Sequence, residues 1–202
     1  METKRLILRD FREEDADDLY AILGDDETMA CLEPAYDREK TRAFLMSFCI
    51  GARGALAAAH RESGRVIGYI LFKPLEQDVY EIGWIFHKAY WRCGFAYEAC
   101  SAVIDYAFGT LGAHKIVAET IDAARSAGLA KKRAVRAPFT RTFFANYRLS
   151  RRCPYAIFYE MKKLGMMLEG VQRAHTRDNA GNWADLYLYG LLRAGWARTA
   201  KG

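Results

Sequence analysis

The fold is decided by the stretch from Tyr80 to Tyr97, which reads YEIGWIFHKAYWRCGFAY. Its first half, up to Phe86, is rich in β-branched and aromatic residues and predicts a half-buried strand. Its second half, from Arg92 to Ala96, is a loop with a Gly-x-Ala turn that leads into a helix. Small residues let main-chain N–H groups approach an anion closely, and a helix start adds partial positive charge. The stretch therefore predicts a phosphate site, with an ordinary strand-to-helix turn as the alternative.

The length and composition are those of one globular domain. The 202 residues are 51% hydrophobic, enough for a full core and too apolar for a disordered chain. The five cysteines are scattered without a Cys-x-x-Cys pair, so we expect reduced thiols and no metal site. No apolar run is long enough to span a bilayer, and the first residues lack a signal-peptide core. We therefore expect a cytoplasmic protein.

The order of the predicted elements indicates a mixed sheet. These elements are a strand (5–11), two helices (15–23 and 39–50), three strands (55–60, 66–72 and 79–87), a helix (97–111), a strand (115–121) and a closing hairpin (169–177 and 183–192). We predict an α/β fold in which a mixed sheet of six to seven strands carries helices on both faces. The basic tail from Arg193 onward is expected to fray.

A family resemblance adds to this interpretation. The loop Trp91-Arg92-Cys93-Gly94-Phe95-Ala96 resembles motif A of the GNAT superfamily of acyl-CoA-dependent N-acyltransferases, with Trp in place of Gln or Arg at the first position. The longer run YWRCGFAYEA, from Tyr90 to Ala99, is similar to the branch that contains the ribosomal-protein-alanine N-acetyltransferases. The opening stretch TKRLILRDF, from Thr3 to Phe11, is also similar to that branch. The resemblance implies the GNAT fold over residues 1–202 as a single domain.

The same resemblance implies acetyl-CoA as the co-substrate and places its binding residues. Main-chain groups of Ile85, Phe86 and His87 would pair with the pantetheine arm, and a strand N–H would polarise the thioester carbonyl. The family usually carries an Asn after the fifth strand that reaches the coenzyme, and Ser126 is the expected substitute here. The residues implied for the pyrophosphate are Arg92, Cys93, Gly94, Phe95, Ala96 and Tyr97.

Acyl transfer to an amine also needs a group that removes a proton, because an amine is mostly protonated at neutral pH. Glu81 on the fourth predicted strand and Glu119 on the fifth are the candidate catalytic residues. The alternative is that each carboxylate is hydrogen-bonded or solvated on a sheet face. His87 and His175 are weaker candidates, and a water chain without a dedicated base is a further alternative.

One block does not fit the family pattern. The segment from Ala130 to Glu160 holds eight Lys and Arg residues and one acidic residue, whereas the whole chain carries a net charge of +5. We interpret it as a basic insertion of about 31 residues within the single domain. Within it, Tyr159 resembles a tyrosine that often serves as general acid in the superfamily. Tyr159 is two residues too far from Gly165, which rotates it by about 200° on a helix, so it receives no role.

The sequence therefore favours an N-acetyltransferase that moves an acetyl group from acetyl-CoA to a primary amine by direct attack in a ternary complex. The acceptor is either a protein N-terminus or a small-molecule amine. One alternative is a catalytically impaired coenzyme-binding relic disrupted by the insertion, and the least favoured is nucleic-acid binding through the insertion. We expect no membrane partner. The oligomeric state stays open, with a homodimer as one option.

Overall fold

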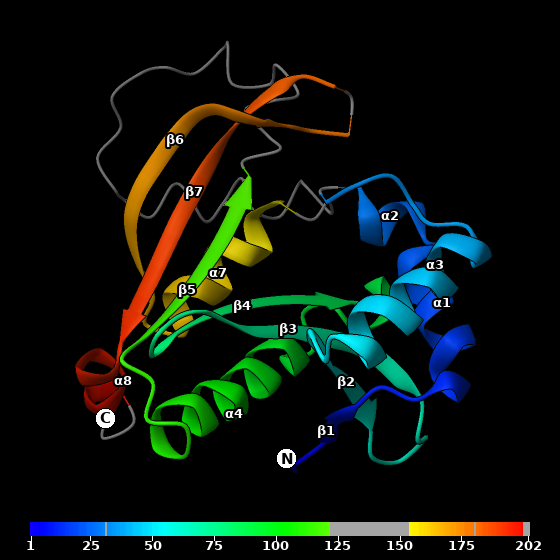
Figure 1. The fold of residues 1–202 in the computed structure, drawn as a ribbon, viewed down its shortest axis with the longest axis horizontal. Coiled ribbons are helices and arrows are strands. Elements are labelled where there is room, and N and C mark those ends of the chain that lie inside the picture. The colour runs from blue at the N-terminus through cyan, green and yellow to red at the C-terminus, as the bar shows by residue number, and fades with distance from the viewer. Residues whose placement is uncertain (31, 122–153, 180, 200–202) are drawn as a thin grey trace.

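The computed structural model describes residues 1–30, 32–121, 154–179 and 181–199 (Figure 1). Within these residues, one seven-stranded sheet has the order β1-β2-β3-β4-β5-β7-β6. Neighbouring strands are antiparallel except β4 and β5, which are parallel. The predicted mixed α/β sheet is thus confirmed. The strands are β1 (Leu6–Asp10), β2 (Ala55–His60), β3 (Val66–Glu76), β4 (Val79–Phe86), β5 (Lys115–Ile121), β6 (Met167–Arg177) and β7 (Trp183–Leu192).

Helices cover both faces of the sheet. On one face, α4 (Phe95–Gly109) and α7 (Pro154–Lys163) share a core with the sheet, to which α7 contributes Met161 and the turn after it contributes Leu164. The other face packs against a second core, supplied from α1 (Ala16–Leu23) to η2 (Leu45–Gly51). The remaining elements are η1 (Glu13–Asp15), α2 (Asp26–Met29), α3 (Arg38–Phe44), η3 (Lys88–Tyr90) and α8 (Arg193–Thr199).

Local sequence explains where the central helix begins. Gly94 precedes α4 with a φ of +77°, a left-handed conformation that glycine adopts without steric cost. The chain can therefore turn directly into the helix, which begins at Phe95 and not at the predicted Tyr97. One face of α4 is then completely buried, since Ala99 and Val103 are both 0% exposed. Alanine on this face lets the helix pack closely on the sheet.

The C-terminal segment differs from the expectation. The tail predicted to fray forms α8 over Arg193–Thr199. The Trp196 Nε1 atom donates a hydrogen bond to Oδ1 of Asp105 on α4 at 2.6 Å. This contact joins residues about ninety positions apart, so local sequence could not have predicted it.

The predicted insertion is described only at its end. Residues 130–153 lie outside the described residues, and residues 154–160 form the beginning of α7. The next residue in that helix, Met161, is 1% exposed, and Leu164 is 0% exposed. The downstream boundary proposed for the insertion therefore falls inside a helix that is anchored in the core.

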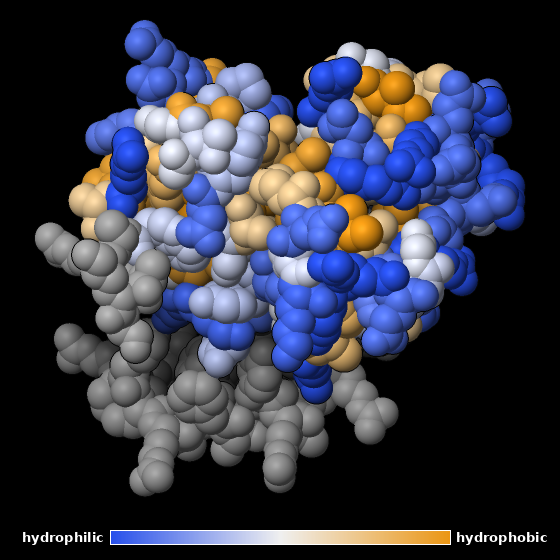
Figure 2. Space-filling view, turned by 90° about the horizontal axis from the view of Figure 1, so that it is seen from below, coloured by the Kyte–Doolittle hydropathy of each residue, from blue (hydrophilic) through white to orange (hydrophobic). Residues whose placement is uncertain are grey.

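The surface is mixed in character. On the face shown in Figure 2, apolar side chains gather in a band across the middle, and hydrophilic side chains cover most of the rest. Scattered apolar groups of this kind are normal on protein surfaces. In the described part of the chain, no helix combines the length and the apolar character needed to cross a membrane.

Candidate functional site

The parallel pairing of β4 with β5 is short. It ends at the pair formed by Glu81 and Val117. However, β4 continues to Phe86 and β5 continues to Ile121, and the two strands separate beyond the paired residues (Figure 1). Among the described residues, the second half of β4 thus has a strand partner on the β3 side only.

The main chain of β4 shows which groups face this gap. The His87 N–H donates to the carbonyl oxygen of Ile67 on the β3 side at 3.0 Å. Main-chain groups of successive strand residues point to alternate sides, so Ile85 also faces β3, whereas Trp84 and Phe86 face the gap. Of the three residues expected to pair with pantetheine, only Phe86 therefore directs its main chain into the gap. Trp84, which the sequence did not indicate, does so as well.

Trp91 ties the following loop to the end of β4. Its Nε1 atom donates to the carbonyl oxygen of Phe86 at 2.6 Å. That bond satisfies the Phe86 carbonyl and leaves the Phe86 N–H directed into the gap. The tryptophan that replaces Gln or Arg at the first position of the motif thus anchors the loop.

A cleft of about 300 Å³ lies at the gap. Strand β4 lines it with residues 81–85, and β5 lines it with residues 119–121. Because successive side chains of a strand point to opposite faces of the sheet, these runs bring both faces to the cleft. The remaining lining residues come from β3, α7, the last hairpin and the segment after α2, and they are Tyr69, Leu71, Met161, Thr176, Arg177, Leu186 and Leu32.

Both predicted carboxylates line this cleft. Glu81 forms an ion pair with Nζ of Lys73 at 3.0 Å, and its side chain is 23% exposed. Glu119 is exposed, and its carboxylate has neither a hydrogen bond nor an ion pair among the described residues. The buried neighbour of Glu119, Ala118, belongs to the core under α4, so Glu119 points to the opposite face. Ile82 likewise belongs to that core, which places the Glu81 side chain on the same face as Glu119.

The loop before α4 and the first three residues of that helix, residues 91–97, are here named the coenzyme loop after the role that the sequence predicted for them. Arg92 and Gly94 both have left-handed backbones, with φ values of +63° and +77°. The first helical bond runs from the Glu98 N–H to the Gly94 carbonyl oxygen at 3.1 Å. The N–H groups of residues 95–97 therefore have no acceptor within the helix, and the helix dipole gives them partial positive charge. Arg92 and Cys93 are exposed, so this end of the helix is accessible to an anion.

Helix α7 adds two residues that the sequence did not single out. The Lys163 Nζ atom lies 3.9 Å from the centroid of the Tyr97 ring, which brings a positive charge to the helix start. Met161 lines the cleft, whereas Tyr159 is 53% exposed and does not. Met161 stands four residues before Gly165, the position that the tyrosine of the family pattern would occupy.

Other predicted residues lie elsewhere. The His87 Nδ1 atom accepts a bond from the Ala89 N–H at 3.2 Å and caps η3, and His175 is exposed on β6. Neither histidine lines the cleft. Ser126 lies outside the described residues. Across the ranges that the structure describes, no three His, Cys, Asp or Glu side chains gather closely enough to hold a metal ion.

Comparison with known proteins agrees with this geometry. The chain is 27% identical over 201 residues to YnaD, an uncharacterized N-acetyltransferase of Bacillus subtilis. That alignment covers 96% of this chain and 97% of the relative. The fold is similar to that of the ribosomal-protein-S5-alanine acetyltransferase from Vibrio fischeri, with 16% identity, a TM-score of 0.67 and 97% of each chain covered. It is also similar to that of spermidine N-acetyltransferase from Vibrio cholerae in complex with CoA and spermine. That match has 16% identity and a TM-score of 0.68, and covers 96% of this chain and 98% of the other.

The family model for the acetyltransferase (GNAT) domain matches residues 5–133. This range is well over half of the chain and contains the gap between β4 and β5 together with the coenzyme loop. The resemblance noted in the sequence is thereby confirmed, and the chain belongs to the GNAT family of acetyltransferases.

Proposed function

We propose that this enzyme transfers the acetyl group of acetyl-CoA to a primary amine by direct attack in a ternary complex. The observation that supports the proposal is the cleft between β4 and β5, which carries both candidate carboxylates. The coenzyme loop lies on the α4 side of the sheet, and the carboxylates point to the other side. Coenzyme and amine would thus enter from opposite faces and meet in the gap.

The coenzyme would be held by main-chain groups along its length. The N–H groups of residues 94–97, with the charge of Arg92, suit a diphosphate. The Phe86 N–H and the main chain of Trp84 suit the amides of pantetheine, which would lie beside β4 as an added strand. The next free N–H along the strand, that of Trp84, would polarise the thioester carbonyl and stabilise the oxyanion that forms on attack. Ser126 remains a proposed coenzyme contact.

We assign proton removal to Glu119, because Glu81 is ion-paired with Lys73. The Glu119 carboxylate takes one proton from the ammonium group, directly or through a water molecule. The amine nitrogen then bonds to the thioester carbon, and collapse of the oxyanion breaks the carbon–sulfur bond. The CoA thiolate leaves and takes a proton from solvent, and the new amide loses its second proton. Glu81 would help to attract the cationic acceptor.

The acceptor class follows from the chemistry of the cleft. The two similar solved structures are named for a ribosomal-protein alanine and for spermidine, both of which present primary amines. Two carboxylates on one face favour an acceptor that arrives as a cation. We therefore propose a positively charged primary amine, either a peptide N-terminus or a small polyamine.

The test is release of free CoA thiol from acetyl-CoA with spermidine and with peptides that begin with alanine or serine. We expect turnover with at least one of these amines. Glu119→Gln should lower kcat by about 10²- to 10⁴-fold without changing the Kd for acetyl-CoA. Glu81→Gln should have a smaller effect on kcat.

The matched control is Glu76→Gln, an exposed carboxylate at the end of β3 that does not line the cleft. It should leave all kinetic constants unchanged. Acetyl-CoA binding without turnover on any amine would contradict the transferase proposal and favour the coenzyme-binding relic. Unchanged kcat in Glu119→Gln would contradict only the assignment of the base.

A further inference from the structure

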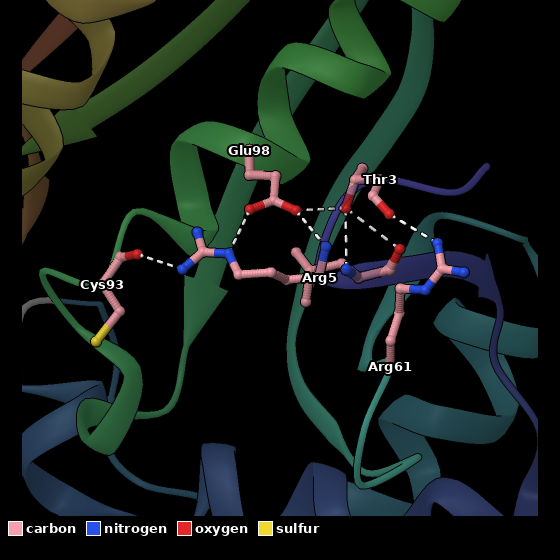
Figure 3. A network of polar contacts seen from close by, with 6 residues as sticks. Thr3, Arg5, Arg61, Cys93 and Glu98 are labelled. Atoms are coloured by element: carbon pink, nitrogen blue, oxygen red, sulfur yellow. Dashed lines mark hydrogen bonds and ion pairs between the residues drawn. The ribbon is translucent and has the colours of Figure 1, made fainter.

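Arg5 contacts the coenzyme loop from the start of the first strand. Its Nη1 atom donates to the carbonyl oxygen of Cys93 at 2.8 Å, and its Nε atom donates to Oε2 of Glu98 at 2.7 Å. The guanidinium carbon lies 4.1 Å from the centroid of the Phe95 ring. One side chain thus touches the loop, the helix start and the first turn of α4, as Figure 3 shows for Cys93 and Glu98.

The other carboxylate oxygen of Glu98 completes the connection. Oε1 accepts hydrogen bonds from the Thr3 hydroxyl and from the Arg5 N–H, both at 2.7 Å. The Thr3 hydroxyl oxygen in turn accepts a bond from the Leu6 N–H at 2.9 Å. Because the Glu98 side chain is only 17% exposed, these bonds are largely shielded from water. The beginning of β1 and the first turn of α4 are therefore one hydrogen-bonded unit.

The bond to Cys93 determines how the loop presents its amides. In a trans peptide unit, the C=O of one residue and the N–H of the next point in opposite directions. Arg5 draws the Cys93 carbonyl toward itself, so the Gly94 N–H is directed to the other side of the loop. The left-handed backbones of Arg92 and Gly94 on either side of Cys93 form the kind of turn whose amides bind anions. Arg5 thus holds the loop in the conformation that a diphosphate requires.

The negative charge of Glu98 is a second reason why the site needs Arg5. Glu98 is the fourth residue of α4, and its negative charge would repel a diphosphate bound at the helix start. Burial raises the pKa of the Glu98 carboxyl, but the bonds from Thr3 and Arg5 outweigh this effect and hold the pKa below its ordinary value. The group is therefore ionised at neutral pH. The Arg5 guanidinium cancels that charge at the site itself.

We infer that Arg5 is a positioning residue for the coenzyme, acting through the Cys93 carbonyl and the Glu98 carboxylate. Thr3, Arg5 and Glu98 then belong to the coenzyme site, although the first two lie about ninety residues before the loop. This inference rests on the proposed use of acetyl-CoA. It also gives a physical reason why the stretches 3–11 and 90–99 both carry the family resemblance, since they form the two sides of one hydrogen-bonded unit.

The test compares two acetyl donors in Arg5→Met and Glu98→Gln. Acetyl-CoA carries the diphosphate, whereas S-acetylpantetheine lacks it. We expect kcat/KM for acetyl-CoA to fall about tenfold to a hundredfold in Arg5→Met, the scale of a lost charged hydrogen bond. Glu98→Gln should cause a smaller loss, because it releases Arg5 but also removes the charge that repels the diphosphate. The value for S-acetylpantetheine should change less than about twofold. The double variant should be no worse than Arg5→Met alone, because the two residues act as one unit.

The matched control is Arg65→Met. Arg65, immediately before β3, donates to Asp18 on α1 at 2.7 Å, and Asp18 also accepts a bond from the Val66 N–H at 2.8 Å. This pair repeats the strand–helix arrangement of Arg5 and Glu98, with the coenzyme loop absent from its contacts. Arg65→Met should leave the preference for acetyl-CoA over S-acetylpantetheine unchanged.

Each outcome either supports or overturns the inferred role of Arg5. Equal losses with both donors, or a lower melting temperature with unchanged donor preference, would show that Arg5 is purely structural and would overturn the inference. If Arg5→Met does not fold, Arg5→Lys replaces it, because lysine keeps the charge but lacks the planar fork that bridges two oxygens. It should show the same loss of preference, in smaller degree. If the unmodified protein binds no acetyl-CoA, the proposed function is overturned as well. If it binds acetyl-CoA and the variants keep its preference for acetyl-CoA over S-acetylpantetheine, this inference alone is overturned.

Discussion

Asn179 joins the last hairpin to the first layer of helices. Its Nδ2 atom donates to the carbonyl oxygen of Met29 at 3.1 Å and to that of Ala30 at 3.3 Å. Both sides of this contact contribute to the cleft, through Arg177 at the hairpin end and Leu32 just after α2. The bond therefore connects two walls of the region where we expect the amine.

Asn179→Ala should loosen these walls. We expect the KM for the amine to rise about threefold to tenfold, while the Kd for acetyl-CoA stays constant, because the loss of one hydrogen bond costs about 1 kcal/mol. Initial rates at varied amine concentration measure the change. Asn182→Ala is the control, since Asn182 bonds within the same turn to Asp178. Equal effects of the two changes would contradict a specific role for Asn179.

Lys163→Met should weaken coenzyme binding. A charge near the diphosphate contributes about 1 kcal/mol at a solvated site, so we expect the Kd for acetyl-CoA to rise about fivefold. Calorimetry should show a smaller difference at high salt. Lys40→Met removes a comparable lysine, 3.7 Å from the centroid of the Tyr36 ring, and should leave the Kd unchanged. A salt-independent change would contradict the electrostatic explanation.

Among the cysteines that the structure describes, Cys93 should be the reactive one. Cys93 is exposed in the coenzyme loop, whereas Cys49 and Cys100 are buried. Burial raises the pKa of Cys49 to about 12 and also raises that of Cys100, so both stay protonated at pH 8 and react poorly. Iodoacetamide should label Cys93, and acetyl-CoA at ten times its Kd should slow this labelling about tenfold. Peptide mass spectrometry measures the rates, and no protection would contradict binding at the loop.

The hydrogen bonds of Glu98 should make the free energy of unfolding depend on pH. The pKa of Glu98 is lowered in the folded state, so the unfolded state binds more protons as the pH falls below about 4.5. The contribution of the ionised carboxylate to stability is therefore complete above that pH and is lost as the pH falls through the folded-state pKa. Urea unfolding at pH 3 to 7 should show the unmodified protein and Glu98→Gln converging in acid. A constant difference would contradict the assignment.

The boundary of the proposed insertion can be tested directly. Replacing residues 130–153 by a short Gly-Ser linker keeps all of α7, so we expect the melting temperature and acetyl-CoA binding to be retained. Extending the deletion through residue 160 removes the first part of α7 and should destabilise the protein, because the helix that holds Met161, and the turn with Leu164 after it, in the core would be shortened to three residues. Lost coenzyme binding in the shorter deletion would show that the block has become part of the site.

Sequence reasoning succeeded where the signal is local. Strands β2 and β5 have the bounds that were predicted, because each is a short, mostly apolar segment near a left-handed glycine turn, at Gly64 and Gly112. Helix α2 was missed because its four residues are too short to show a period. The placement of α8 depends on the bond from Trp196, which no local pattern reveals.

The candidate site likewise combines features that local sequence predicts with features that depend on distant contacts. The turn at Gly94 before α4 was predicted from local sequence, and Glu81 and Glu119 do line one cleft, whereas their roles remain predictions. Three features could not be foreseen: the point at which β4 and β5 part, the free main chain of Trp84, and the bond between Arg5 and Glu98. Each depends on strand register or on contacts between distant segments, and neither is encoded by the residues of a single window.

The separation of β4 from β5 also bears on how fast the coenzyme associates. In the part of the chain that the structure describes, the end of β4 has no strand partner on the β5 side, so no sheet bonds there must break for pantetheine to dock. Association should then be a single kinetic phase whose rate rises linearly with acetyl-CoA concentration, without the plateau that a slow opening step would impose.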